Sequence, residues 1–290
     1  RDLNNAIARF KARWVVKGYE QQFGIDYDQT YAGVAKGALW KVLLALASVL
    51  DLEVEQMDAV TAFLNGETKE LIYVELPDGF KDGNQVCKLQ KALYGLKQAP
   101  RLWQEKLRTE LQKLGFQPLN ADNCIYTTID GLLGISIVTH VDDFLLIGPS
   151  LIAINKFKLK LGSIFPMKDL GPCSQFLGIR LLRDRKTRTI QLVQDSYARK
   201  VVSAFGLENS TPVWTPMEAS ALISMVPYDG EALQSEVKRY QTGVGSLMYA
   251  MTQTRPDLAF TVSCLSRFNH NPSPAHWKSL LRAIKYFGTT

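Results

Sequence analysis

Alternation of apolar and polar residues predicts several short strands in the first two-thirds of the chain. Residues 52–58 alternate and finish on Asp58, which predicts a half-buried strand that ends on a carboxylate. Residues 132–139 and 144–147 are rich in strand-forming residues and flank a short stretch that contains Asp142-Asp143. Two strands joined in this way predict a β-hairpin with a pair of acids at its tip.

Helices are predicted where apolar residues recur with helical spacing. Residues 38–50 are strong helix formers and apolar on most faces, so we expect a buried helix there. Pro100 and Gly115 lie just inside the start and just past the end of a second helical pattern, which carries Trp103 on its apolar face. Three further helices are predicted at residues 151–162, 236–252 and 273–287.

Weaker patterns complete the expected order of elements. Residues 10–16 alternate basic and apolar side chains, which predicts a short strand; it is either a positively charged face or an exposed sheet edge protected by Lys and Arg. Residues 71–75 predict another strand, and residues 176–182 and 190–193 a second hairpin. Residues 206–235 contain several prolines and predict an extended connection. The chain is thus expected to be mixed α and β at first and mostly helical at the end.

Composition narrows the class of protein. The chain has 290 residues, of which 46% are hydrophobic and 21% charged, so it can bury a sizeable core, and disordered or fibrous classes are excluded. This length predicts one large domain or two modest ones. The net charge of +6 suits a polyanionic partner such as nucleic acid, although ordinary cytosolic enzymes reach it too.

Cysteine usage and the lack of targeting signals point to a reducing compartment. The four cysteines are far apart and form no CxxC pair, so we expect neither a disulfide scaffold nor a structural zinc site. No apolar run approaches the roughly 20 residues that a membrane helix needs, and no signal-peptide pattern is present. Because the sequence opens at Arg1 rather than Met, we expect a piece of a longer protein.

The acids at the ends of the predicted strands suggest a metal site. Adjacent carboxylates repel one another, and a third on a neighbouring strand would add to this repulsion. Divalent cations with oxygen ligands, such as Mg²⁺, relieve it, and two such ions about 3.5–4 Å apart activate a 3′-hydroxyl in nucleotidyl transfer. The alternative is that Asp142-Asp143 forms an ordinary polar turn.

Several separate blocks of sequence resemble the reverse transcriptase of copia-type LTR retrotransposons, and the resemblance covers nearly the whole chain. They are, in order, Gln56-Met57-Asp58, Ala62-Phe63-Leu64-Asn65-Gly66, Ile72-Tyr73-Val74-Glu75-Leu76-Pro77, Lys91-Ala92-Leu93-Tyr94-Gly95-Leu96-Lys97-Gln98-Ala99-Pro100, Val141-Asp142-Asp143, Asp169-Leu170-Gly171, Gly245-Ser246-Leu247-Met248-Tyr249 and Thr254-Arg255-Pro256-Asp257.

This resemblance implies an α+β fold of the right-hand polymerase type. Residues 1–186 would form interleaved fingers and palm, with an antiparallel sheet backed by helices. Residues 187–290 would form a mainly helical thumb and a connection towards an RNase H domain, which we expect to be absent. In that case the chain should not degrade the RNA strand itself.

The same resemblance assigns roles to the acids. Asp58 and Asp142 would bind two Mg²⁺ ions, with Asp143 beside them and Mn²⁺ as a substitute. The reaction implied is RNA-directed DNA polymerisation, in which the primer 3′-hydroxyl attacks a deoxynucleoside triphosphate.

Residues around the incoming nucleotide follow from the same family pattern. Lys11 and Arg13 match a basic fingers strand that can hold the triphosphate, because a guanidinium forms fork-like contacts with phosphate oxygens. Phe63 matches the aromatic residue that excludes a 2′-hydroxyl by shape, and Gln98 matches a position that lines the nucleotide pocket. The alternative for Phe63 is plain core packing.

Primer and template contacts are implied elsewhere. His140 stands where the family usually has Tyr, and this change predicts lower efficiency because His offers the primer end a smaller ring and no hydroxyl. A basic stretch could follow primer or template phosphates, although a solvated basic hairpin explains it equally well. Its residues are Arg180, Arg183, Arg185 and Lys186.

The expected partners are template RNA or DNA, a primer strand and deoxynucleoside triphosphates, with neighbouring integrase and RNase H domains of a polyprotein outside this chain and no membrane. The expected location is cytoplasmic, in a virus-like particle, with a nuclear phase. Two other functions stay open: a remnant that only binds primer–template nucleic acid, which His140 favours, and a metal-dependent nuclease, for which the sequence offers no water-activating base.

Overall fold

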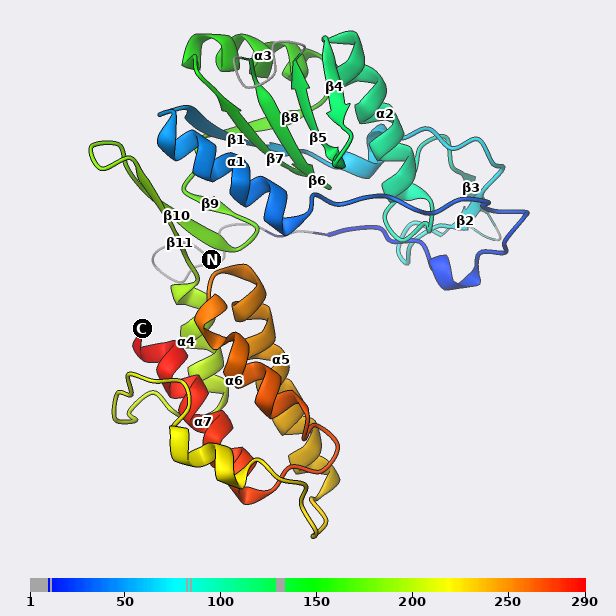
Figure 1. Ribbon diagram of the computed structural model, residues 1–290. Helices are drawn as coiled ribbons and strands as arrows, with labels where there is room; N and C mark the ends of the chain where they lie inside the picture. The colour runs from blue at the N-terminus through cyan, green and yellow to red at the C-terminus, as the bar shows by residue number, and fades with distance from the viewer. Residues whose placement is uncertain (1–9, 11, 82, 84, 129–133) are drawn as a thin grey trace. The chain divides into compact units, whose positions relative to one another are not determined.

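The computed structural model describes residues 10, 12–81, 83, 85–128 and 134–290. The chain divides into two compact units (Figure 1). Unit 1 comprises Arg1–Cys173 and Asp184–Thr189, and unit 2 comprises Ser174–Arg183 and Ile190–Thr290. Each unit has its own hydrophobic core, so each is described by itself.

A six-stranded sheet forms the centre of unit 1, in the order β4-β5-β6-β7-β1-β8. Every neighbouring pair in it is antiparallel. The strands are β1 (Glu53–Ala59), β4 (Phe116–Leu119), β5 (Asp122–Thr128), β6 (Ser136–His140), β7 (Asp143–Gly148) and β8 (Met167–Pro172). The predicted strand at 52–58 and the predicted hairpin are confirmed as β1 and as β6 with β7. Neither the β4–β5 pair nor β8 is among the predicted strands.

Two helices pack on one face of this sheet, α2 (Ala99–Lys113) and α3 (Leu151–Ile164). Both were predicted. Pro100 lies in the first turn of α2, where a missing N–H costs nothing, and Gly115 follows its end with φ +90°. The largest core of unit 1 is built from both helices and the inward side chains of the strands, among them Trp103, Leu107, Leu111, Ile154, Leu161, Phe144 and Leu146.

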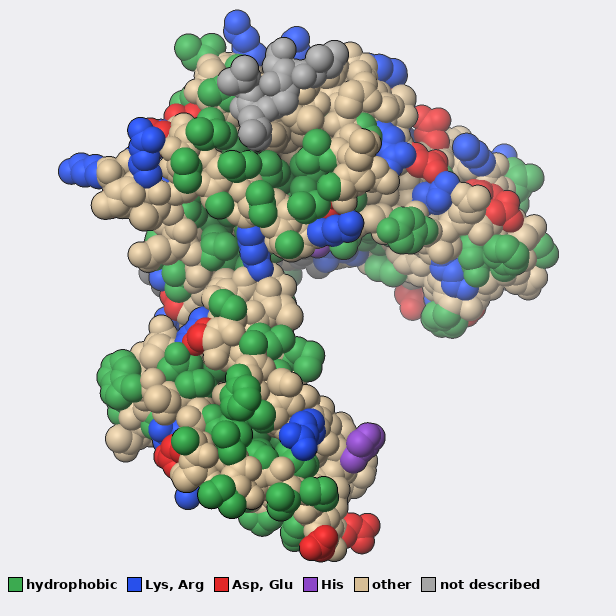
Figure 2. Space-filling model, in the orientation of Figure 1, with side chains coloured by type: hydrophobic (Ala, Val, Ile, Leu, Met, Phe, Trp, Pro, Cys, Tyr) green, Lys and Arg blue, Asp and Glu red, His purple; other side chains and the backbone are tan. Residues whose placement is uncertain are grey.

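The predicted helix at 38–50 forms as α1 (Gly37–Val49) and contacts β1 and β7. The expectation that it is buried on most faces is wrong. Only one side is buried, through Trp40, Leu43, Leu44 and Ala47. Val42 and Val49 are 53% and 61% exposed. Figure 2 shows hydrophobic side chains at the surface in this region. An apolar sequence therefore did not distinguish a core helix from one that covers a sheet on a single side.

The strand predicted at residues 10–16 is also wrong, because the described residues of this segment form no strand. The Val16 N–H donates to the Tyr94 carbonyl at 2.8 Å, but no ladder follows. The segment continues into a short 3₁₀ helix, Gly18–Glu20. It is held by side chains instead, since Trp14 and Val16 pack on a small core beneath the hairpin of β2 (Tyr73–Glu75) and β3 (Val86–Lys88).

Unit 2 is mostly helical, with α4 (Asp195–Ala204), α5 (Gln234–Gln253), α6 (Ala259–Ser266) and α7 (Pro274–Thr289) around one core. A three-stranded sheet of β9 (Gln175–Phe176), β10 (Ile179–Asp184) and β11 (Thr189–Val193) precedes them. The predicted helices α5 and α7 and the second hairpin are confirmed, while α4 and α6 are not among the predicted helices. The predicted connection contains one 3₁₀ helix, η4 (Ala219–Ser224). Among the described residues, no helix is both long and apolar enough to cross a membrane.

A buried ion group ties α3 to the sheet in unit 1. The Lys158 ammonium donates to Glu55 of β1 at 2.7 Å and to Asp169 of β8 at 2.6 Å. Lys158 and Glu55 are 5% and 4% exposed, so each needs the other to offset its loss of water. Burial lowers the pKa of Lys158, but the two carboxylates outweigh this effect and raise it overall. The group fixes β8 beside β1.

We predict that Lys158→Met lowers the free energy of unfolding by about 3–5 kcal/mol, because it leaves the Glu55 charge buried and unpaired. Urea unfolding of the full chain measures this, with Lys160→Met on the exposed side of α3 as the control. Adding Glu55→Met to Lys158→Met should recover most of the loss. Equal stability of Lys158→Met and the control would contradict the assignment.

The ion group also has a pH dependence. Burial raises the pKa of Asp169, but the Lys158 ammonium and the Gly171 N–H lower it more, so the pKa lies below its usual range. Asp169 therefore contributes stability that is complete above the usual carboxyl pKa of about 4 and is lost as the pH falls through the folded-state value. Lys158→Met should reduce this acid-side dependence in urea unfolding measured as a function of pH, while the contribution of the Gly171 N–H remains.

Candidate active site

The three acids singled out from the sequence come together where β1, β6 and β7 meet. In the antiparallel register, Asp58 lies opposite Asp143, and His140 lies opposite the same Asp143 from the other side. Asp142 occupies the turn between β6 and β7, and its carbonyl accepts the Ala59 N–H at 2.7 Å. All three carboxylates are half-buried. The expected hairpin with acids at its tip is confirmed.

The turn that carries Asp142 is strained. Val141 has φ +59°, a left-handed conformation that is unfavourable for a β-branched residue and costs about 1–3 kcal/mol. The Val141 carbonyl accepts a 2.7 Å hydrogen bond from Trp103 Nε1, and the Trp103 ring is 2% exposed and packs edge-on against Phe165. Trp103 of α2 thus holds the turn through this hydrogen bond, which offsets the strain.

The acids create an unfavourable electrostatic environment for one another. The pKa of Asp143 is raised, first by burial and then by the charges of Asp142 and Asp58, while His140 acts in the opposite direction. A cation placed among these carboxylates would relieve both the burial cost and the repulsion. The donor set consists of carboxylate oxygens, which are the ligands that Mg²⁺ and Mn²⁺ prefer.

The residues present therefore fit a divalent cation. As the side chains stand, however, no group of three His, Cys, Asp or Glu residues within the described ranges is close enough together to hold a metal ion. The assignment of metal ligands remains a prediction.

Two of the four predicted nucleotide-binding residues contact the ring of one tyrosine, Tyr94. The Arg13 guanidinium lies 5.6 Å from the centre of the Tyr94 ring, and the Phe63 ring packs against the same ring at 4.9 Å. Phe63 also contacts both the sheet core and the small core beneath β2 and β3. Its orientation is thereby fixed by packing. Lys11, the third of these residues, lies outside the described part of the chain.

Gln98 is placed differently. It is 2% exposed, and its amide donates to the Asp26 carbonyl at 2.7 Å and accepts from Gln21 at 3.0 Å. These bonds connect the N-terminal segment to the start of α2. The polar atoms of the Gln98 side chain thus already form hydrogen bonds within the protein. A contact with a nucleotide would require at least one of these hydrogen bonds to break.

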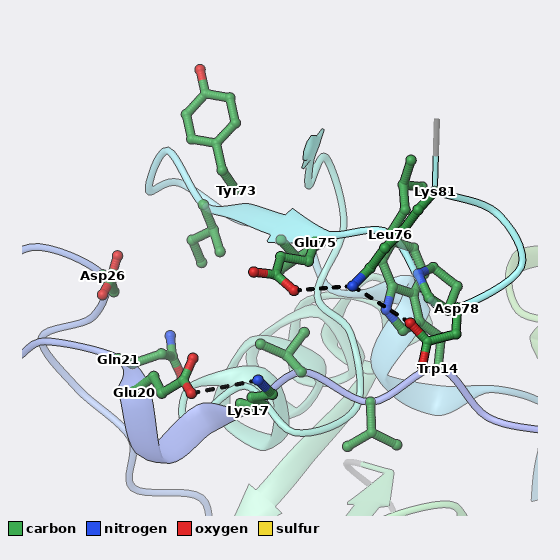
Figure 3. A pocket seen from close by; sticks show the side chains of 15 residues that line it. Trp14, Lys17, Glu20, Gln21, Asp26, Tyr73, Glu75, Leu76, Asp78 and Lys81 are labelled. Atoms are coloured by element: carbon green, nitrogen blue, oxygen red, sulfur yellow. Dashed lines mark ion pairs between the residues drawn. The ribbon is translucent and has the colours of Figure 1, made fainter. Parts of the chain in front are cut away.

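A cavity of about 690 Å³ lies between the N-terminal segment and β2, away from the carboxylates (Figure 3). Its charged groups are largely paired: Lys17 lies 3.7 Å from Glu20, and Lys81 lies 3.6 Å from Glu75 and 3.5 Å from Asp78. Asp26 also lines it. Since acids outnumber lysines in this lining, the cavity does not suit a triphosphate.

The predicted primer–template residues of the basic stretch are divided between the two units. Arg180 pairs with Asp195 at 3.2 Å within unit 2. Arg185 pairs with Asp51 at 3.1 Å and also with Glu53, within unit 1. Arg183 lies on β10, and Lys186 is exposed in the turn that follows. Two of these arginines are thus paired with carboxylates, and both the phosphate-binding prediction and the alternative of a solvated basic hairpin stay open.

His140 lies beside the acids, but its Nδ1 atom is buried and makes no hydrogen bond with any described residue. The imidazole is half-buried and faces Asp143 across the strand pair. The difference from the family motif, His in place of Tyr, drew attention to His140. The sequence gave no sign that Trp103 supports the Val141 turn or that Tyr94 contacts Phe63 and Arg13. Their roles depend on contacts between segments that are distant in sequence.

The sequence matches the family described as reverse transcriptase (RNA-dependent DNA polymerase) over residues 1–219, and the chain belongs to that family. More particularly, it is similar to Pol polyproteins of copia-type retrotransposons, as the sequence motifs predicted. It is 41% identical, over its whole length, to the retrovirus-related Pol polyprotein from transposon TNT 1-94 of Nicotiana tabacum.

Two relatives from Arabidopsis thaliana, the Pol polyproteins from transposons RE2 and RE1, are 33% and 34% identical over 99% of the chain. The chain spans 22%, 20% and 19% of the TNT 1-94, RE2 and RE1 polyproteins. It therefore corresponds to about a fifth of the length of these relatives.

We predict that Trp103→Phe lowers the free energy of unfolding by about 1–2 kcal/mol, because the Val141 carbonyl loses its indole donor while most of the ring packing remains. Urea unfolding measures the change, and Trp214→Phe, at a 74% exposed position, is the control. The assignment of Trp103 as the support of the turn fails if both variants unfold at the same urea concentration.

Proposed function

We propose that the chain is an RNA-directed DNA polymerase that transfers deoxynucleotides to a primer 3′-hydroxyl. The observation that supports this proposal best is the register of β1, β6 and β7, which brings Asp58, Asp142 and Asp143 to one point of the sheet in a chain of the reverse transcriptase family. Mutual repulsion among these acids is the electrostatic condition that cation binding relieves.

We further propose the right-hand arrangement for this chain. Unit 1, with its antiparallel sheet backed by α2 and α3, would supply fingers and palm. Unit 2, which is mostly helical, would supply the thumb and connection. The proposed boundary at residue 186 falls in the turn between β10 and β11. This turn, Asp184–Thr189, belongs to unit 1, whereas most residues of β10 and β11 belong to unit 2.

Asp58 and Asp142 would hold two Mg²⁺ ions, with Asp143 beside them. When bound, such ions activate the attacking hydroxyl and stabilise the charge on the leaving pyrophosphate. The chain's own contribution is positioning: Trp103 and the β1–β7 pairing hold the turn so that the carboxylates do not have to be ordered at the moment of reaction.

Arg13, Tyr94 and Phe63 would form the nucleotide side of the site. Arg13 can contact phosphate oxygens while its guanidinium remains over the Tyr94 ring. Phe63 would exclude a 2′-hydroxyl, because the contact with Tyr94 leaves its ring little freedom to move aside. Gln98 and Lys11 stay proposed contributors. Template RNA or DNA, primer and neighbouring integrase and RNase H domains are the proposed partners.

A second function is favoured by one observation. The Nδ1 atom of His140 is buried and has no hydrogen-bond partner among the residues that the structure describes, and it lies beside the acids, where the family motif usually has Tyr. A chain impaired at this position would bind primer–template duplex without extending it efficiently. His140→Tyr tests this directly.

We expect the full chain to extend a DNA primer on a homopolymer RNA template in Mg²⁺ or Mn²⁺. Asp142→Asn should reduce the rate by at least about a thousandfold, because the substitution keeps the size of the side chain but removes the charge that holds the cation. Asp229→Asn, at an exposed position of unit 2, is the control. His140→Tyr should extend faster than the wild type.

The outcomes separate the two functions. No extension by the wild type, together with extension by His140→Tyr, would mean that one residue disables an intact site. No extension by either protein, with binding of duplex retained, would contradict the polymerase proposal and leave the binding function. Extension that survives Asp142→Asn would contradict the role of the carboxylates.

A further inference from the structure

The N-terminal segment of unit 1 crosses the residues that lead into α2, and the two backbones meet at a pair of glycines, Gly18 and Gly95. The Val16 N–H donates to the Tyr94 carbonyl at 2.8 Å, one residue before Gly95. A methyl group added to Gly18 would overlap the Gly95 carbonyl oxygen, and one added to Gly95 would overlap the Val16 carbonyl oxygen. Both clashes are with backbone atoms, which no side-chain rotation relieves. The crossing therefore requires that neither position carry a side chain.

The two glycines differ in their backbone conformation. Gly95 has φ +94°, so an alanine would be strained there as well as crowded. Gly18 begins the 3₁₀ helix Gly18–Glu20 and is not among the described glycines with positive φ, so an alanine would be unfavourable there through its volume. Substitution of Gly18 thus tests the close approach separately from the backbone conformation.

A second set of contacts fixes the segment on the C-terminal side of the crossing. The Gln21 side chain accepts a hydrogen bond from the Lys97 N–H at 2.7 Å and donates to the Gln98 amide oxygen at 3.0 Å. The Lys97 ammonium donates to the Tyr27 hydroxyl at 3.2 Å and lies 4.7 Å from the centre of the Tyr27 ring. Residues 21–27 are thus fastened to the start of α2, so a displacement at the crossing is passed on to the residues before it.

The residues before the crossing include Arg13. Trp14 and Val16 pack on the small core beneath β2 and β3, and the Arg13 guanidinium lies 5.6 Å from the centre of the Tyr94 ring. Tyr94 supplies the carbonyl that the crossing engages, and its ring packs against Phe63 at 4.9 Å. A shift of the backbone at the crossing therefore moves Arg13 relative to both rings.

We propose that Gly18 and Gly95 are positioning residues for the incoming nucleotide, because their close approach fixes Arg13 where its guanidinium can contact the triphosphate. The inference rests on the proposed function for the role of Arg13, but it assigns the two glycines a role of their own. A contact with phosphate oxygens that is equal in the ground state and the transition state changes nucleotide affinity and leaves the rate of the chemical step unchanged. The affinity for duplex should also stay unchanged, whereas a loss of folding would lower both affinities.

The test is equilibrium binding of dTTP to the full chain in complex with a poly(rA) template and a DNA primer that ends in a dideoxynucleotide, so that no turnover occurs. Gly18→Ala should raise the Kd for dTTP about tenfold, since the displaced guanidinium loses a charge-assisted hydrogen bond. The matched control is Gly162→Ala, at an exposed position of α3 where an added methyl group meets no other part of the described chain within 4 Å. This control should bind dTTP like the wild type.

A double-mutant cycle separates positioning from a general loss of structure. In the Arg13→Ala background, Gly18→Ala should change the Kd for dTTP by less than about twofold, because the guanidinium that it displaces is already gone. Equal effects of Gly18→Ala in the two backgrounds would overturn the proposal, and so would an unchanged Kd in the wild-type background.

If Gly18→Ala does not fold, Gln21→Ala takes its place, because it removes two hydrogen bonds of the same segment and adds no volume. It should raise the Kd for dTTP in the wild-type background and leave it unchanged in the Arg13→Ala background. An unchanged Kd in both backgrounds would overturn the proposal.

Extension of a primer with a free 3′-hydroxyl, measured in parallel, separates this inference from the proposed function. A chain that binds dTTP with the predicted pattern but does not extend the primer keeps the positioning role and loses the proposed activity. A chain that extends the primer, and whose Gly18→Ala variant binds dTTP as tightly as the wild type, keeps the activity and loses the positioning role. A wild type that binds no dTTP overturns both.

Discussion

The antiparallel pairing of β1 with β7 positions both the three acids of the candidate site and the buried ion pair of unit 1. It places Asp58 opposite Asp143, brings the Asp142 carbonyl to the Ala59 N–H, and leaves the other face of β1 to Glu55 and its partner Lys158. Since side chains alternate along a strand, a shift of one residue would bury Asp58 and expose Glu55. The core of α2 and α3 and the ion group with β8 oppose such a shift.

The two sets of charges on β1 show how one strand serves stability and chemistry together. Glu55 is paired with the buried Lys158 ammonium. Asp58 lies opposite Asp143 on one side and Lys168 of β8 on the other. The pKa of Asp143 is raised by burial and by the charges of Asp142 and Asp58, and this rise reflects stabilising energy that the fold forgoes there. The strained Val141 turn adds to this cost, and Trp103 offsets it. Repulsion between carboxylates and backbone strain coincide at the turn between β6 and β7, as is common at functional sites.

Strong local patterns predicted the parts of this fold that are stabilised locally. The β6–β7 hairpin, α2 and α7 follow from alternation, proline and glycine positions and helix spacing, and the family motifs located the three acids. The failures involve distant partners. The segment at residues 10–16 alternates like a strand but is held by Tyr94 and a small core, α1 is covered on one side only, and the support of Val141 by Trp103 joins residues far apart in the chain. Periodicity describes which side chains share a face, and it cannot describe what that face contacts.

Binding of Mn²⁺ to the full chain, titrated by electron paramagnetic resonance, tests whether the carboxylates of Asp58 and Asp142 form a cation site, and it requires no primer, template or turnover. We predict that the wild type binds Mn²⁺ and that Asp58→Asn and Asp142→Asn each weaken binding by at least about tenfold, or about 1.4 kcal/mol. Asp78→Asn, at an exposed acid of the β2–β3 region, should bind like the wild type. Equal Mn²⁺ affinity in all four proteins would contradict the assignment of these carboxylates as a cation site.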